Sequence, residues 1–142
     1  MTFASILNQL QGGLIVSCQA PADSPLHQPE VIAAIAEAAV QSGAIAVRID
    51  SPDHIAAVRQ RVTVPIIGLW KQVIPGSEVY ITPQFHHAQA VAAAGADVIA
   101  IDATPRSRPG GETLAALIEQ IHTALNRPVM ADIDTLASAQ AA

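Results

Sequence analysis

The 142-residue sequence contains few aromatic side chains, few charges and a single cysteine. Aromatic residues make up 3% of the chain and charged residues 13%, against roughly 25% charged residues in an average soluble domain. The low charge predicts that another subunit or further sequence covers part of the surface, and we expect a homo-oligomer. One cysteine, Cys18, excludes an internal disulfide framework and is typical of a reducing compartment, so we expect a cytoplasmic protein.

Long runs of one residue class are also missing. The formal net charge is -5 with no run of lysine or arginine, which argues against a nucleic-acid partner. No apolar run reaches the roughly 18 residues of a membrane span, and the start lacks the basic region of a signal peptide, so no membrane association is expected. Neither absence excludes an anionic small molecule, because a few arginines can hold one phosphate.

Aliphatic residues in alternating strand and helix patterns dominate the chain. Hydrophobic residues make up 51% of it, a mixture typical of Ala-rich helices packed on parallel strands. We predict a single domain over residues 1–142, with a short helix in residues 1–11 and then five β/α units. The expected strands cover residues 14–19, 44–50, 64–71, 96–102 and 128–134, and the expected helices cover residues 29–42, 52–62, 84–94 and 112–126, with a further helix starting after residue 134.

Two internal repeats indicate the architecture. EAAVQSGAIAVRID and QAVAAAGADVIAID share a helix end, a glycine and a strand that ends in Ile-Asp, and they lie two β/α units apart. VTVPIIGLW and LNRPVMADI repeat another strand in the same way. This alternation favours an α/β fold, a parallel (β/α)₈ TIM barrel represented by about five of its units. An open doubly wound sheet is the alternative, although no GxGxxG or P-loop follows the first strand.

Polar residues end all five predicted strands. In parallel α/β folds the ligand lies beyond the carboxyl ends of the strands, where these side chains should converge. They would suit a polyhydroxylated, acidic or phosphorylated substrate, although each alone also fits the solvated end of a strand. The residues are Ser17 and Gln19, Arg48 and Asp50, Lys71, Asp102 with Thr104, and Asp132 with Asp134.

The basic residues near the strand ends each allow two interpretations. Lys71 follows the buried pattern IIGLW and is either a general base at the rim or a surface lysine. Arg48 could bind a carboxylate or phosphate, or pair with Asp50 or Asp102. Arg106 and Arg108 lie in the loop TPRSRPGG, which is either a phosphate clamp or, as we favour, a solvated loop.

No metal site is expected from the histidine and cysteine spacings. His86 and His87 are adjacent and should point to different faces of a helix start, and the other histidines fall in segments expected away from the rim: His27, His54 and His122. Cys18 is expected to be a buried thiol. Ser51 is expected to cap the following helix, with a proline at its first position.

The same residues carry a family resemblance. In order and spacing, GLIVSCQA, AVRID, VPIIGLWKQ, EVYITP, DVIAIDAT and VMADI resemble the N-acetylmannosamine-6-phosphate 2-epimerases along essentially the entire chain. The resemblance implies a TIM barrel and an isomerase that interconverts N-acetylmannosamine 6-phosphate and N-acetylglucosamine 6-phosphate at C2, in sialic acid and amino-sugar catabolism, with no cofactor. The partner it implies is a small phosphorylated amino sugar.

The resemblance also assigns roles to individual residues. It implies that Lys71 is the catalytic lysine, that Gln19, Arg48 and Asp132 hold the sugar, and that Asp102 and Thr104 have a supporting role. The family's second catalytic residue, a glutamate, and its phosphate site belong to later strands, so the chain resembles the N-terminal part only. Two alternatives stay open: an inactive half-barrel that serves as an assembly or sugar-phosphate binding module, and an epimerase for a different phosphosugar.

Overall fold

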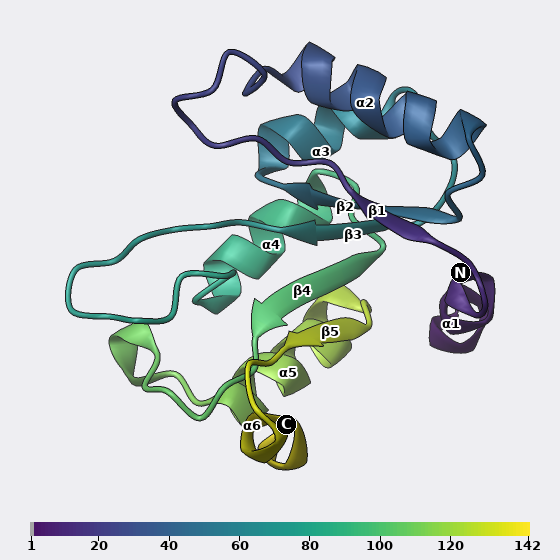
Figure 1. Cartoon of the computed structure of the whole chain (residues 1–142). Helices are drawn as coiled ribbons and strands as arrows, with labels where there is room; N and C mark the ends of the chain where they lie inside the picture. The colour runs from purple at the N-terminus through teal and green to yellow at the C-terminus, as the bar shows by residue number, and fades with distance from the viewer. Residues whose placement is uncertain (1) are drawn as a thin grey trace.

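The computed structural model describes residues 2–142, and a five-stranded parallel sheet organises all of them (Figure 1). The strands follow one another in the order of the sequence, and each neighbouring pair is parallel. A doubly wound sheet reverses its strand order at a switch point, so the unbroken order excludes that alternative. The strands are β1 (Ile15–Ser17), β2 (Ala46–Asp50), β3 (Ile66–Leu69), β4 (Val98–Asp102) and β5 (Val129–Asp132).

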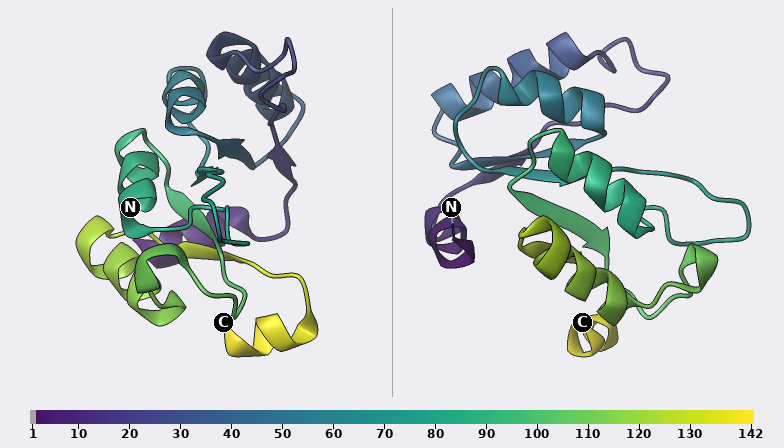
Figure 2. Two further views of the ribbon diagram at one scale, coloured as in Figure 1. Left: turned by 90° about the vertical axis from the view of Figure 1, so that its left-hand side faces the viewer. Right: turned by 180° about the vertical axis from the view of Figure 1, so that it is seen from behind.

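Helices follow the strands along the chain, and the helices between successive strands pack on one face of the curled sheet (Figure 2). The curled sheet with its outer helices is a truncated TIM barrel, as the sequence predicted. The expected helix over 112–126 is divided into two parts. An α-helix, α5 (Leu114–Gln120), is capped by Thr113, and a π-helical turn, Ile121–Leu125, follows it directly. The α-helices are α1 (Phe3–Leu10), α2 (Pro29–Gln41), α3 (Pro52–Arg59), α4 (Phe85–Ala93), α5 (Leu114–Gln120) and α6 (Leu136–Ala141).

Side-chain alternation along the strands produces two apolar layers. One layer faces the helices and includes Val47, Ile49 and Ile99. The other lies on the concave face of the sheet, where strand residues pack against Ile6 of α1. Figure 1 shows α1 at the end of the sheet from which the strands start. The polar residues that end the strands, such as Asp50 and Asp102, therefore lie at the opposite end.

Gly68 allows two helices to approach β3 closely. A Cβ atom built on Gly68 would lie 2.6 Å from the Ala96 side chain, 2.7 Å from Val91 and 2.9 Å from Ile55. Because real Cβ atoms do not make contacts this short, the close packing of α3 and α4 on β3 requires a glycine at this position.

Ser51 occupies the N-cap position of α3, as predicted, and its carbonyl oxygen accepts a hydrogen bond from the Ile55 N–H. Its side chain makes no capping hydrogen bond, and its φ of 77° lies in the left-handed region. The predicted position is therefore confirmed, with Pro52 beginning the helix, but the side-chain cap is absent.

Candidate active site at the carboxyl ends of the strands

The predicted polar residues share the concave face. Strand register pairs Arg48 with Ile67 and Asp50 with Leu69, and both of these partners belong to the concave apolar layer. Side chains two residues apart on a strand share a face. The polar ends of β2 and β3 therefore continue the concave layer past its apolar part.

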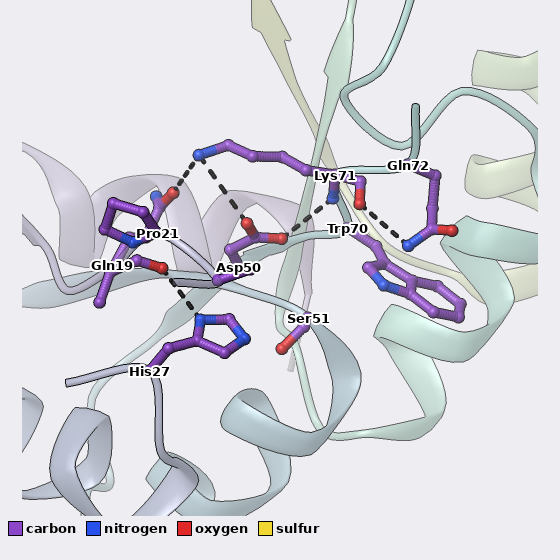
Figure 3. Close-up of a pocket in the computed structure, with 10 residues that line it drawn as sticks. Gln19, Pro21, His27, Asp50, Ser51, Trp70, Lys71 and Gln72 are labelled. Carbon is purple, nitrogen blue, oxygen red and sulfur yellow. Dashed lines mark hydrogen bonds and ion pairs between the residues drawn. The ribbon is translucent and has the colours of Figure 1, made fainter. Parts of the chain in front are cut away.

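Lys71 stands at the centre of a network from three neighbouring strands (Figure 3). It is the only lysine in the sequence. Its Nζ donates a hydrogen bond to Gln19 Oε1 at 2.7 Å and lies 3.8 Å from Asp50 Oδ2. The Lys71 backbone N–H donates to the other carboxylate oxygen, Oδ1, at 3.0 Å. The side chain is 42% exposed, so the ammonium is both held and accessible.

A pocket of about 530 Å³ adjoins this network. Gln19 and Lys71 line it, and Gln19 is itself fixed because its amide Nε2 donates to Ser17 Oγ at 2.9 Å. Trp70 contributes apolar surface, while polar groups come from the ends of β1, β2 and β3 and the loops that follow them. The remaining lining residues are Ala20, Pro21, Ala22, His27, Asp50, Ser51 and Gln72.

Arg48 crosses the concave face to reach Asp132 of β5. Its guanidinium donates to the Asp132 carboxylate at 2.5 Å, with both side chains 25% exposed. Of the alternatives left open by the sequence, pairing with Asp50 or Asp102 does not occur, because the curl of the sheet brings Asp132 of β5 within reach of the long β2 side chain. Burial raises the pKa of Asp132, while the charge and hydrogen bond of Arg48 act in the opposite direction.

Asp102 and Thr104 form a local unit at the end of β4. The Asp102 carboxylate accepts hydrogen bonds from the Thr104 N–H at 2.8 Å and from the Thr104 hydroxyl at 2.7 Å, and both residues are buried. With Asp132 they line a second pocket, of about 360 Å³. Five of the predicted site residues therefore fall into two groups, Gln19 with Lys71 at the first pocket and these three at the second, and Arg48 reaches the second group through Asp132.

The loop between β4 and α5 contains a buried arginine. Arg108 is 7% exposed and donates hydrogen bonds to the backbone carbonyl oxygens of Pro83, Asp102 and Thr82. The expected solvated loop is wrong for this residue, which fastens the β3–α4 segment to the end of β4. Arg106 is more exposed and pairs with Asp134 at 2.6 Å.

One histidine lies closer to the rim than the sequence predicted. His27 lines the first pocket, where its Nδ1 donates to the Ala20 carbonyl oxygen at 3.0 Å, so its expected place away from the rim is wrong. His54 lies edge-on to it, with ring centroids 4.5 Å apart. The rings of His86 and His87 are tilted by 40° with centroids 3.8 Å apart, but His86 is exposed whereas His87 is buried against Trp70, so the two face different surroundings, as expected.

Sequence reasoning missed several residues of the first pocket. Asp50 was recognised only as a polar strand end, and Trp70 was taken as part of a buried strand. His27 and Ser51 carry no local signal, because loop conformation brings them to the rim.

Metal-binding and membrane-spanning features can be assessed over residues 2–142. In this range no group of three or more histidine, cysteine or acidic side chains is placed to hold a metal ion. None of the helices in the same range has the length and apolar character needed to cross a membrane. Cys18 is buried, as expected, and burial raises the pKa of its thiol.

These features define a parallel β/α-barrel protein whose polar site lies at the carboxyl ends of the strands. Residues 32–142 match the family model described as "Putative N-acetylmannosamine-6-phosphate epimerase". The chain belongs to this family of carbohydrate epimerases.

Relatives with the corresponding 2-epimerase description cover almost the whole chain. The protein from Thermosynechococcus vestitus is 66% identical over 97% of the chain and 60% of its own length, and that from Synechococcus elongatus is 61% identical over 96% and 59%. The chain therefore spans about three fifths of the length of the curated relatives it matches.

Solved structures show the same fold. The N-acetylmannosamine-6-phosphate 2-epimerase from Clostridium perfringens has a TM-score of 0.90 at 40% identity, over 94% of this chain and 58% of that one. A phosphonomutase described for Burkholderia cenocepacia has a TM-score of 0.53 at 21% identity, over 89% and 57%, and shows the fold alone.

Proposed function

We propose that this chain supplies the N-terminal part of an epimerase active site that interconverts N-acetylmannosamine 6-phosphate and N-acetylglucosamine 6-phosphate at C2, in sialic acid and amino-sugar catabolism. The observation that carries the proposal is the placement of Lys71. The only lysine of the sequence stands on the concave rim, hydrogen-bonded to Gln19 beside an open pocket. Membership of an epimerase family supports a role for this lysine as an acid/base group.

The chemistry requires a base at C2 and support for the resulting enolate. A C2 proton becomes acidic next to the C1 aldehyde of the open-chain sugar, and its removal moves negative charge onto the C1 oxygen. Neutral Lys71 would take this proton from one face of C2 and become the ammonium form. Inversion requires a proton to be delivered to the opposite face, so we propose that a second acid/base group supplies it and that the two groups exchange roles in the reverse direction.

The other site residues would bind and orient the sugar. Gln19 would offer its amide beside Lys71, while Arg48 and Asp132 would supply donors and acceptors for hydroxyl or carbonyl oxygens. Asp102 and Thr104 hydrogen-bond each other, so we assign them the support of this wall. A sugar phosphate bound by Gln19 and Lys71 at one end and by Asp132 at the other would extend from the first pocket towards the second.

A conversion assay tests this function. The chain should be joined to the remaining part of the Thermosynechococcus vestitus relative and assayed with N-acetylmannosamine 6-phosphate, with ribulose 5-phosphate as the comparison substrate. We expect formation of N-acetylglucosamine 6-phosphate and no epimerisation of the pentose phosphate. Turnover of the pentose phosphate alone would support a different phosphosugar epimerase, and binding without turnover would support a sugar-phosphate binding module.

A further inference from the structure

We propose that Asp50 is a positioning residue that fixes Lys71 at the rim and keeps its ammonium next to Gln19. Asp50 is the last residue of β2, and its carboxylate contacts two atoms at opposite ends of Lys71. The physical part of the proposal concerns the position of Lys71 alone. Only its consequence for turnover rests on the proposed function.

The carboxylate replaces a ladder partner that β2 does not provide. Register between β2 and β3 ends at the pair Asp50 and Leu69, two residues before Lys71. Beyond this point the Lys71 N–H has no strand partner on the β2 side, and it donates to Asp50 Oδ1 instead. On its other side Lys71 pairs antiparallel with Ile81. The backbone of the lysine is thus fixed from both directions, which sets where its side chain starts.

The second oxygen of Asp50 acts on the far end of the same side chain. A lysine side chain has four rotatable bonds, so holding it in one conformation costs conformational entropy. Asp50 Oδ2 lies 3.8 Å from Nζ, and Gln19 Oε1, fixed through Ser17, accepts from Nζ at 2.7 Å. Two acceptors from β2 and the β1 loop therefore confine the ammonium to one corner of the pocket.

Exposure indicates that this contact is more than a surface ion pair. The Asp50 side chain is 19% exposed and that of Lys71 is 42% exposed. Paired side chains that are both exposed usually contribute little, whereas Asp50 is largely enclosed by the network it organises. Removing its negative charge while keeping its shape should therefore free the lysine without unfolding the strand ends.

Amine labelling tests the positioning directly, because Lys71 is the only lysine. Asp50→Asn keeps an oxygen for the Lys71 N–H and removes the charge beside Nζ. In an aqueous setting, loss of a unit charge 3.8 Å from the amine should change the rate of amine acylation by about threefold to sixfold. We therefore expect Lys71 to be acylated by an anhydride about three to six times faster at pH 7, as measured by peptide mapping. Asp53→Asn is the matched control, since Asp53 is exposed on α3 and makes no contact with Lys71 in the described structure.

The kinetic consequence separates this inference from the proposed function. In the joined protein described above, Asp50→Asn should lower kcat about tenfold and change KM by less than about twofold, since it displaces an acid/base group without removing a substrate contact. Unchanged labelling overturns the inference, and so does faster labelling with an unchanged kcat. Faster labelling in a protein that never converts the sugar supports the positioning of Lys71 and contradicts the proposed function alone.

Discussion

The concave rim contains two pockets, and the Arg48 side chain connects them. Its strand, β2, ends at the first pocket, where Asp50 and Lys71 lie, while its guanidinium contacts Asp132 in the second. Arg48 donates to Asp132 Oδ2, so the other carboxylate oxygen, Oδ1, keeps acceptor capacity for another donor. A sugar hydroxyl would be a suitable one.

Replacement of Arg48 is predicted to weaken substrate binding. Hydrogen bonds to a charged group contribute about 1.5–3 kcal/mol, which corresponds to roughly a tenfold to hundredfold change in affinity. In the joined protein we expect Arg48→Ala to raise KM by that factor with a smaller effect on kcat. Arg61→Ala is the control, because Arg61 pairs with Glu30 and Glu37 on α2, away from the rim. An unchanged KM would assign Arg48 a structural role through Asp132.

The site residues were predictable where a strand positions them. Gln19, Arg48, Lys71 and Asp132 follow apolar strand patterns, and parallel strands bring their carboxyl ends to one edge. The partner of Arg48 was not predictable, because it depends on how far the sheet curls between β2 and β5. The role of His27 depends on a loop, whose path has no periodic signal.

At the scale of elements, the carboxyl ends of β2 and β4 were predicted correctly, while the other strand ends were predicted one to two residues too long. Glycine and polar residues bound the apolar runs, but the sheet ladder covers only their middle. The segment after β3 was expected as a plain loop. It instead folds back so that Lys71 pairs with Ile81, and buried Thr82 holds it through bonds to Trp70 and Ala100, contacts that join positions far apart in sequence.

Gly68 provides a stability test of helix packing on β3. Gly68→Ala introduces a Cβ into contacts of 2.6–2.9 Å with Ala96, Val91 and Ile55, so α3 and α4 must shift. Overpacking of this kind costs about 1–3 kcal/mol. We expect urea denaturation to show a loss of unfolding free energy in that range, whereas an unchanged midpoint would show that the helices yield freely.

Two buried histidines predict loss of stability on mild acidification. Burial lowers the pKa of His54 on α3 and of His87 on α4 from the usual value of 6.5. Below about pH 6.5 the unfolded chain therefore binds more protons than the folded one, and stability falls as pH decreases. We expect the melting temperature to drop between pH 7.5 and 5.5, and the drop to be smaller in His54→Gln with His87→Gln. An equal drop in the variant would contradict this assignment.

For the whole molecule, the two edge strands predict association. β1 and β5 each have one neighbour in the sheet, and unpaired edges recruit other chains. Large apolar side chains are exposed near both, among them Leu14 at 66% and Ile133 at 47%. We expect light scattering of the 142-residue chain to show a dimer or larger assembly that does not epimerise alone, since two copies only duplicate Lys71. A monodisperse monomer would contradict the edge-strand argument.

The central claim is that Lys71 exchanges the proton at C2 of the amino sugar phosphate. The most direct measurement is the incorporation of solvent deuterium at C2 of N-acetylmannosamine 6-phosphate, followed by NMR in deuterated water, for the joined protein and its Lys71→Met variant. We predict rapid exchange in the parent and a rate lower by about 10²-fold to 10⁴-fold in Lys71→Met, the usual contribution of an acid/base group, with unchanged melting. Exchange in the variant at more than about half the parent rate would contradict the account.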